Sequence, residues 1–265
     1  MNNLKIQPCW ILCTPRTGSS YLCELLNNSG CFQKFHHENM VNQIGPLEKG
    51  QSFNEWCRLY DNFNQFLHDP PIFCKMIHHQ LFEVINNIPK ENRYKPGFYS
   101  NKYDEKVLKN FSEKYNSEYF KRILFPDLKF IKLKRDVIKN AVSLYCSRIT
   151  QKYHIYDEES LLKYKNMNIE INENKLIESF IDAKNNEKIW DSFGAHAECI
   201  LISYDDLINN TEITLNDIFT YLNISVSSKD VIKKTKDKSR IFKMTRDDFG
   251  HIEEKLRQLL KNKIL

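Results

Sequence analysis

The sequence lacks three features that would each define a class of protein. No apolar run is long enough to span a bilayer, and the N-terminus carries no apolar leader. None of the 8 cysteines has Cys-x-x-Cys spacing, which gives a zinc site or a thioredoxin-type redox site little support. The net charge of +5 is far from the basic extreme of nucleic-acid-binding proteins. We therefore expect a cytoplasmic protein with reduced cysteines, no transmembrane segment, no metal and no nucleic-acid partner.

The chain does have the composition of a globular protein. Its 265 residues are 41% hydrophobic and 12% aromatic, enough for a substantial core, and we expect a single domain over residues 1–265. Apolar strand-like runs alternate with segments of helical periodicity, which predicts an α/β fold with a central parallel sheet flanked by helices. The predicted strands cover residues 8–13, 71–77, 129–134 and 199–202. The predicted helices include residues 51–67, 111–123, 136–152, 175–190, 211–222 and 252–260.

A tight loop between the first strand and the first helix carries the most informative residues. It holds Arg16, Gly18 and the hydroxyl residues Thr17, Ser19 and Ser20 where the helix begins. A helix N-terminus presents unpaired N–H groups and a positive dipole end, so it suits a phosphate. Gly18 lets the backbone approach an anion without a Cβ, and Arg16 adds a multidentate cation. The alternative is an ordinary capped helix after a buried strand.

This loop does not match two common phosphate-binding patterns. The Walker A pattern ends in Gly-Lys-Ser/Thr after an earlier glycine, and both that glycine and the lysine are absent. The three-glycine pattern of dinucleotide-binding proteins is also absent. A nucleotide triphosphatase is therefore disfavoured.

A second stretch, residues 130–144, combines a strand end with a following helix. Arg135 leaves the end of the predicted strand, and Ser143 lies about two helical turns later, on a face that can return toward the same point. An arginine and a hydroxyl that converge there would form a second phosphate clamp. The alternative is a surface arginine paired with Asp136 and a serine in mid-helix.

Both stretches resemble the sulfotransferases that use 3′-phosphoadenosine 5′-phosphosulfate (PAPS). Residues 14–22, Thr-Pro-Arg-Thr-Gly-Ser-Ser-Tyr-Leu, are similar to the family's 5′-phosphosulfate loop. The arginine resembles the bacterial carbohydrate branch, typified by trehalose 2-sulfotransferase and lipopolysaccharide sulfotransferases. Residues 123–144, with a Phe-Pro turn, an Arg-Asp strand end and Ala-Val-Ser-Leu, are similar to the 3′-phosphate segment. Residues 202–207 resemble the family's Tyr-Glu-Asp-Leu segment, and the P-loop-like sulfotransferase fold follows as an expectation.

The resemblance implies roles for the two clamps. Arg135 and Ser143 would grip the 3′-phosphate, and Arg16 would neutralise the leaving 5′-phosphate. The N–H groups of residues 17–20 and the hydroxyls of Ser19 and Ser20 would hold that 5′-phosphate. Further candidates of lesser weight are Lys75, Tyr145, Arg148, Lys152, Lys238, Arg240 and Arg246.

The general base stays open between a carboxylate and a histidine. The family has a glutamate after the first helix, in a Gly-x-x-Gly-Arg-Pro-x-Glu-like segment. Residues 30–38 occupy that place here, but they lack the second glycine and the Arg-Pro pair and contain one extra residue. Glu38 matches the glutamate, while His36 and His37 compete because imidazole is a natural base near neutral pH. A third interpretation is that these residues form an ordinary polar strand edge.

We therefore expect PAPS-dependent transfer of a sulfuryl group to a hydroxyl of a sugar or glycolipid. PAPS would be the donor substrate, no metal would be needed, and a homodimer stays open. One alternative is a non-catalytic protein that binds 3′-phosphoadenosine nucleotides, which the altered 30–38 segment keeps open. The other is a small-molecule kinase, against which the missing Walker lysine argues.

Overall fold

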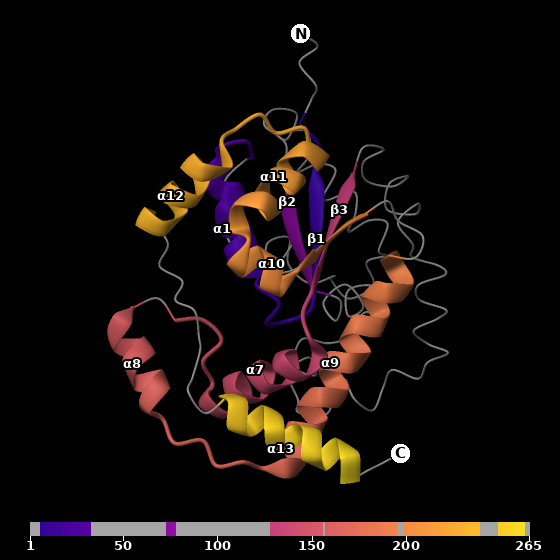
Figure 1. Cartoon of the computed structure of the whole chain (residues 1–265), viewed down its shortest axis with the longest axis vertical. Helices are drawn as coiled ribbons and strands as arrows, with labels where there is room; N and C mark the ends of the chain where they lie inside the picture. The colour runs from indigo at the N-terminus through magenta and orange to yellow at the C-terminus, as the bar shows by residue number, and fades with distance from the viewer. Residues whose placement is uncertain are drawn as a thin grey trace, which may run out of the picture.

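The computed structural model describes residues 6–32, 73–77, 128–155, 157–194, 199–238 and 249–262. Within them, four parallel strands form one sheet in the order β2-β1-β3-β4 (Figure 1). The strands are β1 (Cys9–Cys13), β2 (Phe73–Ile77), β3 (Lys129–Lys134) and β4 (Cys199–Ser203). The predicted α/β fold with a parallel sheet is confirmed. The helices predicted at 51–67 and 111–123 lie outside the described residues.

Strand β1 occupies the middle of the sheet because it is apolar along its whole length. All five of its residues, Cys-Trp-Ile-Leu-Cys, are buried, as expected for a parallel strand covered on both faces. Ile11 aligns with Lys75 of β2 on one side and with Ile131 of β3 on the other. The loop that follows β1 therefore starts at the centre of the sheet's carboxyl edge, where ligands of such sheets bind.

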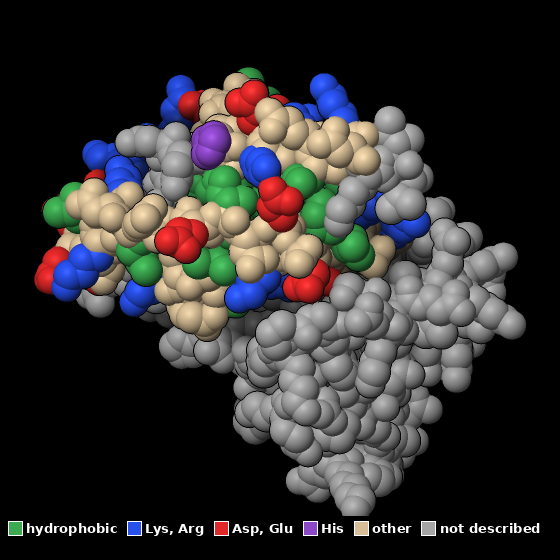
Figure 2. All heavy atoms as spheres, turned by 90° about the horizontal axis from the view of Figure 1, so that it is seen from below, with side chains coloured by type: hydrophobic (Ala, Val, Ile, Leu, Met, Phe, Trp, Pro, Cys, Tyr) green, Lys and Arg blue, Asp and Glu red, His purple; other side chains and the backbone are tan. Residues whose placement is uncertain are grey.

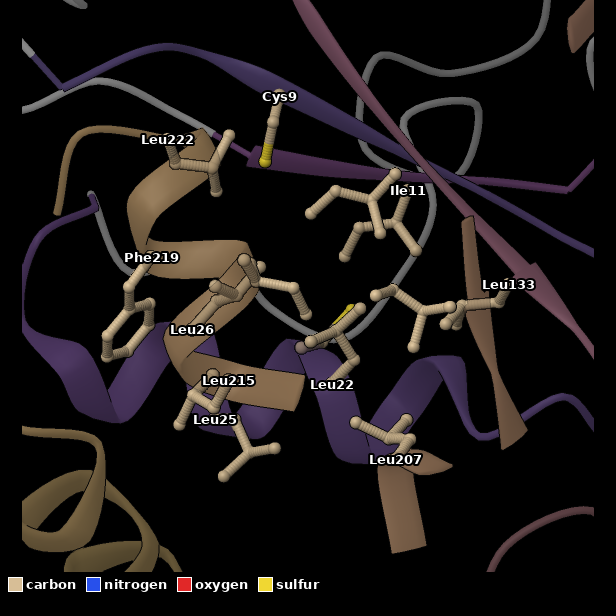
Figure 3. Packing of buried hydrophobic residues seen from close by; sticks show 14 of the residues in the cluster. Cys9, Ile11, Leu22, Leu25, Leu26, Leu133, Leu207, Leu215, Phe219 and Leu222 are labelled. Atoms are coloured by element: carbon tan, nitrogen blue, oxygen red, sulfur yellow. The ribbon is translucent and has the colours of Figure 1, made fainter. Parts of the chain in front are cut away.

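One face of the sheet packs against α1 (Ser19–Ser29), α10 (Tyr204–Asn209) and α11 (Thr211–Tyr221). Figure 3 shows Leu22 and Leu26 of α1 lying between the strand residues Ile11 and Leu133 and the helix residue Phe219. Helix α12 (Ser228–Lys238) packs outside α1, where the Asn28 amide donates to the Thr235 hydroxyl at 3.1 Å. This core fixes the direction in which α1 leaves the loop.

The other face carries α9 (Glu173–Gly194), which packs along α7 (Val137–Thr150) and against α13 (Phe249–Asn262) (Figure 1). The Trp10 and Phe130 rings meet nearly at right angles on this side of the sheet, with their centroids 6.1 Å apart. The Trp190 indole donates to the Cys13 carbonyl at 2.9 Å, so α9 holds the end of β1 directly. Figure 2 shows this end of the molecule from below, with both signs of charge mixed among apolar side chains.

An ion cluster joins β3 to α9. The Lys132 amine is buried and donates to Asp191, and the Lys134 amine lies 2.9 Å from the same carboxylate and 3.5 Å from Glu187. Burial alone would raise the pKa of Asp191, but hydrogen bonds from the two lysines outweigh it and lower that pKa. The carboxylate therefore offsets the cost of placing the Lys132 charge inside the protein.

Most helix limits lie within a few residues of the predicted ones, and two helices were not predicted. Asp136 caps α7 as expected, with its carboxylate accepting from the Lys139 N–H at 2.9 Å. Helices α8 (Glu158–Asn166) and α12 were not predicted, because few of their residues are apolar. No helix of the described ranges has the length and apolar content needed to cross a membrane.

We predict that Asp191→Asn lowers the free energy of unfolding at pH 7 by about 1–3 kcal/mol, because Lys132 stays buried beside a neutral partner. Glu187→Gln is the matched control. Its contact with the partly exposed Lys134 is longer, so its loss should cost less than ~1 kcal/mol. Urea denaturation of both variants measures the difference, and equal costs would contradict the role of Asp191.

The same pair predicts a pH dependence. Because the folded pKa of Asp191 is lowered, its stabilisation is present above the unfolded pKa and is lost as the pH falls through the folded one. The difference in the free energy of unfolding between the wild type and Asp191→Asn should therefore shrink below about pH 4.

Candidate functional site

The loop from β1 to α1 turns sharply within a few residues. Arg16 and Gly18 both have left-handed backbones, with φ of 69° and 83°. Glycine adopts this conformation readily, whereas an arginine pays a strain cost and persists there only when contacts hold it. The Thr17 hydroxyl closes the turn by donating to the Thr14 carbonyl at 2.8 Å. The chain thus adopts an unusual backbone conformation at the carboxyl edge of the sheet.

Helix α1 starts without a side-chain cap. Gly18 occupies the cap position and makes no side-chain hydrogen bond, so the first-turn N–H groups stay available to an anion. Ser19, which we had expected at the phosphate, is buried and hydrogen-bonded with the Cys13 thiol. Burial raises the pKa of that thiol to about 11, so it is neutral at pH 7. Ser20 is half-buried at the helix start.

Arg135 reaches across from the end of β3 and holds the loop. One terminal nitrogen of its guanidinium donates to the Arg16 carbonyl at 2.8 Å. The guanidinium also stacks over the Tyr204 ring, 4.1 Å from its centroid. Its Nε is buried and has no hydrogen-bond partner among the described residues. Arg135 therefore retains a buried donor that an anion could satisfy.

Gly18 is required by the same arrangement. A Cβ at this position would lie 3.0 Å from the ring carbon Cδ2 of Tyr204 and 3.4 Å from Leu207. The start of α10 therefore lies directly against the loop, and Tyr204 contacts both the loop and Arg135. Ser203 caps α10 by accepting from the Asp206 N–H at 2.9 Å, which fixes where Tyr204 stands.

The Arg16 side chain turns toward α7. Its Nε donates to the Ser143 hydroxyl at 3.2 Å, and one terminal nitrogen donates to the Tyr153 carbonyl. Burial lowers the pKa of Arg16, and the nearby positive charge of Arg135 adds to that effect. Burial is also the main cause of the lowered pKa of Arg135. Two desolvated arginines thus lie together at one sheet edge, an arrangement that favours a bound anion.

Two further contacts anchor the loop to the α7 and α9 side. The Asn140 amide of α7 donates to the Thr14 hydroxyl at 3.0 Å, and Trp190 binds the neighbouring Cys13 carbonyl. The loop is therefore positioned by two segments that are distant from it in sequence. Residues 135–140 contribute Arg135 and Asn140, and α9 contributes Trp190. Such support is what a preorganised anion site needs.

The structure brings Arg16, Arg135 and Ser143 together, with Thr17, Gly18 and the start of α1 beside them. It places other candidates elsewhere. The Tyr145 hydroxyl donates to the Glu170 carbonyl at 2.9 Å and accepts from the Asn172 N–H at 2.8 Å. Arg148 pairs with Asp182 at 2.5 Å. Tyr145 thus fastens α7 to the segment just before α9, and Arg148 fastens α7 to α9 itself. Lys152 is exposed beyond the end of α7.

Lys75 is buried in the middle of β2, close enough to influence the buried thiols of Cys13 and Cys23. It therefore lies in the core beneath α1. The candidate bases Glu38, His36 and His37 lie outside the described residues. So do Arg240 and Arg246 and the side chain of Lys238.

Sequence reasoning gave no role to Tyr153 or Tyr204. Tyr204 stands in a segment that we had singled out, but its stacking under Arg135 has no sequence signature of its own. Tyr153 acts through its main-chain carbonyl, which any residue would supply. The described residues contain no group of His, Cys, Asp and Glu side chains that could hold a metal ion. Chemically, the two arginines and the uncapped start of α1 form a site that suits an anion.

Comparison with known proteins adds three findings. The model of the sulfotransferase family matches residues 8–228. A search of curated proteins finds no match. Among solved structures, the sulfotransferase domain from the curacin biosynthetic pathway is 14% identical over 97% of this chain and 91% of its own, with a TM-score of 0.50. The sulfotransferase domain from the Synechococcus PCC 7002 olefin synthase is 14% identical over 97% and 90%, with a TM-score of 0.44.

At this identity, the curacin-pathway domain shows a common fold and nothing finer. The family match shows more than a common fold, because it covers most of the chain. It runs from the start of β1 to the start of α12 and includes the loop, Arg135 and Ser143. The chain therefore belongs to the sulfotransferase family.

Proposed function

We propose that the chain transfers a sulfuryl group from PAPS to a hydroxyl of a carbohydrate or glycolipid. The observation that carries this proposal is the convergence of Arg16, Arg135 and Ser143 at the uncapped start of α1. PAPS carries phosphate groups at both its 5′ and 3′ ends, so it needs two anion clamps. A nucleoside triphosphate would not need the second.

The residues present fit such a donor. The first-turn N–H groups of α1 have no side-chain cap, and the Nε of Arg135 is a buried donor without a hydrogen-bond partner in the described part of the chain. Anions stabilise both kinds of group. We assign the 5′-phosphate to the loop from Arg16 to Ser20 and the 3′-phosphate to Arg135 and Ser143. When bound, PAPS supplies the sulfuryl group that is transferred.

Ser143 can serve both clamps at once. Its oxygen accepts from the Arg16 Nε at 3.2 Å, which leaves the hydroxyl proton free to be donated to a phosphate oxygen. This contact holds the Arg16 guanidinium beside the start of α1, where its charge would stabilise negative charge that develops on the leaving phosphate. The desolvated surroundings strengthen that stabilisation relative to the same contact in water.

The acceptor hydroxyl needs a base, and we propose Glu38 for that role, with His36 as the competing residue. The choice of a carbohydrate acceptor rests on Arg16, which resembles the bacterial carbohydrate branch. The curacin-pathway neighbour adds a reason to include hydroxylated biosynthetic intermediates among the acceptors tested.

We further propose that the chain is one domain and works in a reducing compartment, the cytoplasm. Support for one domain comes from α13, whose Ile252 and Leu256 are buried in the same cluster as Ala141 and Tyr145 of α7. The six cysteines whose state the structure describes are free thiols, which suits a reducing compartment.

The decisive test is a screen for transfer from radiolabelled PAPS to extracted glycans, glycolipids and hydroxylated biosynthetic intermediates. We expect label in a glycan or glycolipid fraction. Tight binding of 3′-phosphoadenosine 5′-phosphate (PAP) without transfer to any fraction would favour the non-catalytic alternative. Transfer of phosphate from ATP to a small molecule would favour a kinase.

We predict that PAP binds more than about tenfold tighter than ADP, or ~1.4 kcal/mol, because ADP lacks the 3′-phosphate that Arg135 would contact. Arg135→Ala should remove most of this preference. Lys229→Ala, which deletes the same charge at an exposed site on α12, should leave it intact. Calorimetry measures the six affinities, and equal binding of PAP and ADP by the wild type would refute the second clamp.

We predict that Glu38→Gln binds PAP normally and loses about 10²–10⁴-fold in turnover, because the amide cannot accept a proton at neutral pH. His36→Asn and His37→Asn should cost much less. The acidic limb of the pH–rate profile should lie near ~4–5 for a carboxylate base and near ~6.5 for a histidine. Collapse in His36→Asn with full activity in Glu38→Gln would assign the base to the histidine.

A further inference from the structure

The contact between Arg16 and the main chain after α7 has no counterpart in the roles assigned so far. We propose that residues 151–155 and 157–166, here called the Arg16 strap, form a positioning element for the leaving-group arginine. The Tyr153 carbonyl holds the guanidinium, and a small core of Ile155, Leu161 and Tyr164 holds the carbonyl. The proposal rests on the proposed function insofar as it assigns Arg16 to the leaving phosphate.

Two acceptors fix the plane of the Arg16 guanidinium. The Ser143 hydroxyl accepts from Nε, and the Tyr153 carbonyl accepts from a terminal nitrogen. A guanidinium is planar and rigid, so two contacts at different nitrogens set its orientation as well as its position. Ser143 belongs to the proposed donor site, but Tyr153 does not. Through the Tyr153 carbonyl, the strap therefore contacts Arg16 from outside the two clamps.

The chain is firmly held just before Tyr153. Gln151 ends α7 in a left-handed conformation with φ of 55°. The Thr150 hydroxyl donates to the Cys146 carbonyl at 2.7 Å and accepts from the Lys152 N–H at 3.3 Å. These contacts end the helix and hold the chain just before Tyr153, whose carbonyl accepts from Arg16.

The chain is held again just after Tyr153. Ile155 and Tyr164 are each 1% exposed and form a separate small cluster, with Leu161 packed against it. Tyr164 is the buried residue of α8, whose remaining described residues are exposed or half-buried. It lies close enough to interact electrostatically with the Arg16 guanidinium. Helix α8 is therefore anchored through a side chain that lies close to Arg16.

This arrangement predicts a specific loss when the anchor is weakened. The hydrogen bond from Arg16 to the Tyr153 carbonyl links the strap to the clamps. Because the strap would act on the donor through this bond, donor affinity should change little. The orientation of Arg16 matters most when leaving-group charge develops, so turnover should fall. If the strap acts through Arg16, the effect of a strap variant should disappear once Arg16 itself has been removed, so the two effects should not add.

The test combines Tyr164→Phe and Ile155→Ala with Arg16→Ala, and uses Tyr145→Phe as the matched control. Tyr145 is also a buried tyrosine, but its hydroxyl binds the Glu170 carbonyl and the Asn172 N–H, away from the loop. We expect each strap variant to lower the rate of PAPS conversion to PAP by about 5–20-fold, while its PAP affinity stays within about twofold of the wild type. In the Arg16→Ala background, the strap variants should lower this rate no further. Tyr145→Phe should change the rate equally little in both backgrounds.

A second measurement needs no nucleotide. If the strap fixes Arg16, then Arg16 fixes the strap, and Arg16→Ala should accelerate amide hydrogen exchange in residues 151–166. Unchanged exchange there, or equal losses of rate from the strap variants in both backgrounds, would overturn the proposal. A wild-type protein that neither binds PAP nor converts PAPS would overturn the proposed function, while the exchange measurement would still decide whether the strap holds Arg16.

Discussion

The hydrogen bond from Arg135 to the Arg16 carbonyl is the contact on which the rest of the site depends. It joins the end of β3 to the loop after β1, and it holds an arginine whose left-handed backbone is unfavourable on its own. With the carbonyl fixed, the Arg16 side chain is directed toward α7, and the chain can enter α1 through Gly18. The packing of Tyr204 against both Gly18 and Arg135 completes the arrangement.

The fold explains why these groups meet. In a parallel sheet the carboxyl ends of neighbouring strands share one edge, so residues after β1, β3 and β4 lie together although they are far apart in sequence. The side chains of Arg16 and Arg135 are also largely removed from water at this edge. Desolvating two cations is costly, and a bound anion would recover much of that cost. The burial of the two arginines therefore lowers the stability of the protein without ligand, and a bound anion would restore part of that stability.

Sequence patterns predicted the parts of this structure that depend on local apolar periodicity and capping. The four described strands, the Asp136 cap and the helical turn after Ser203 are confirmed. The meeting of Arg135 and Ser143 with the loop followed from strand order and helical geometry. Helix α8 could not be predicted, because Tyr164 alone is buried there and one buried residue gives no period. The role of Tyr153 could not either, because a main-chain carbonyl carries no residue identity.

The two-point hold on Arg16 has a consequence for how this site can change over evolution. A lysine at this position would present one compact ammonium on a flexible stem, and it could not reach the Ser143 hydroxyl and the Tyr153 carbonyl with the fixed spacing of a guanidinium. An exchange between the two basic residues is therefore not neutral in this chain. We expect residue 16 and the segment after α7 to vary together among relatives, with a shorter or differently folded segment wherever lysine occupies the loop.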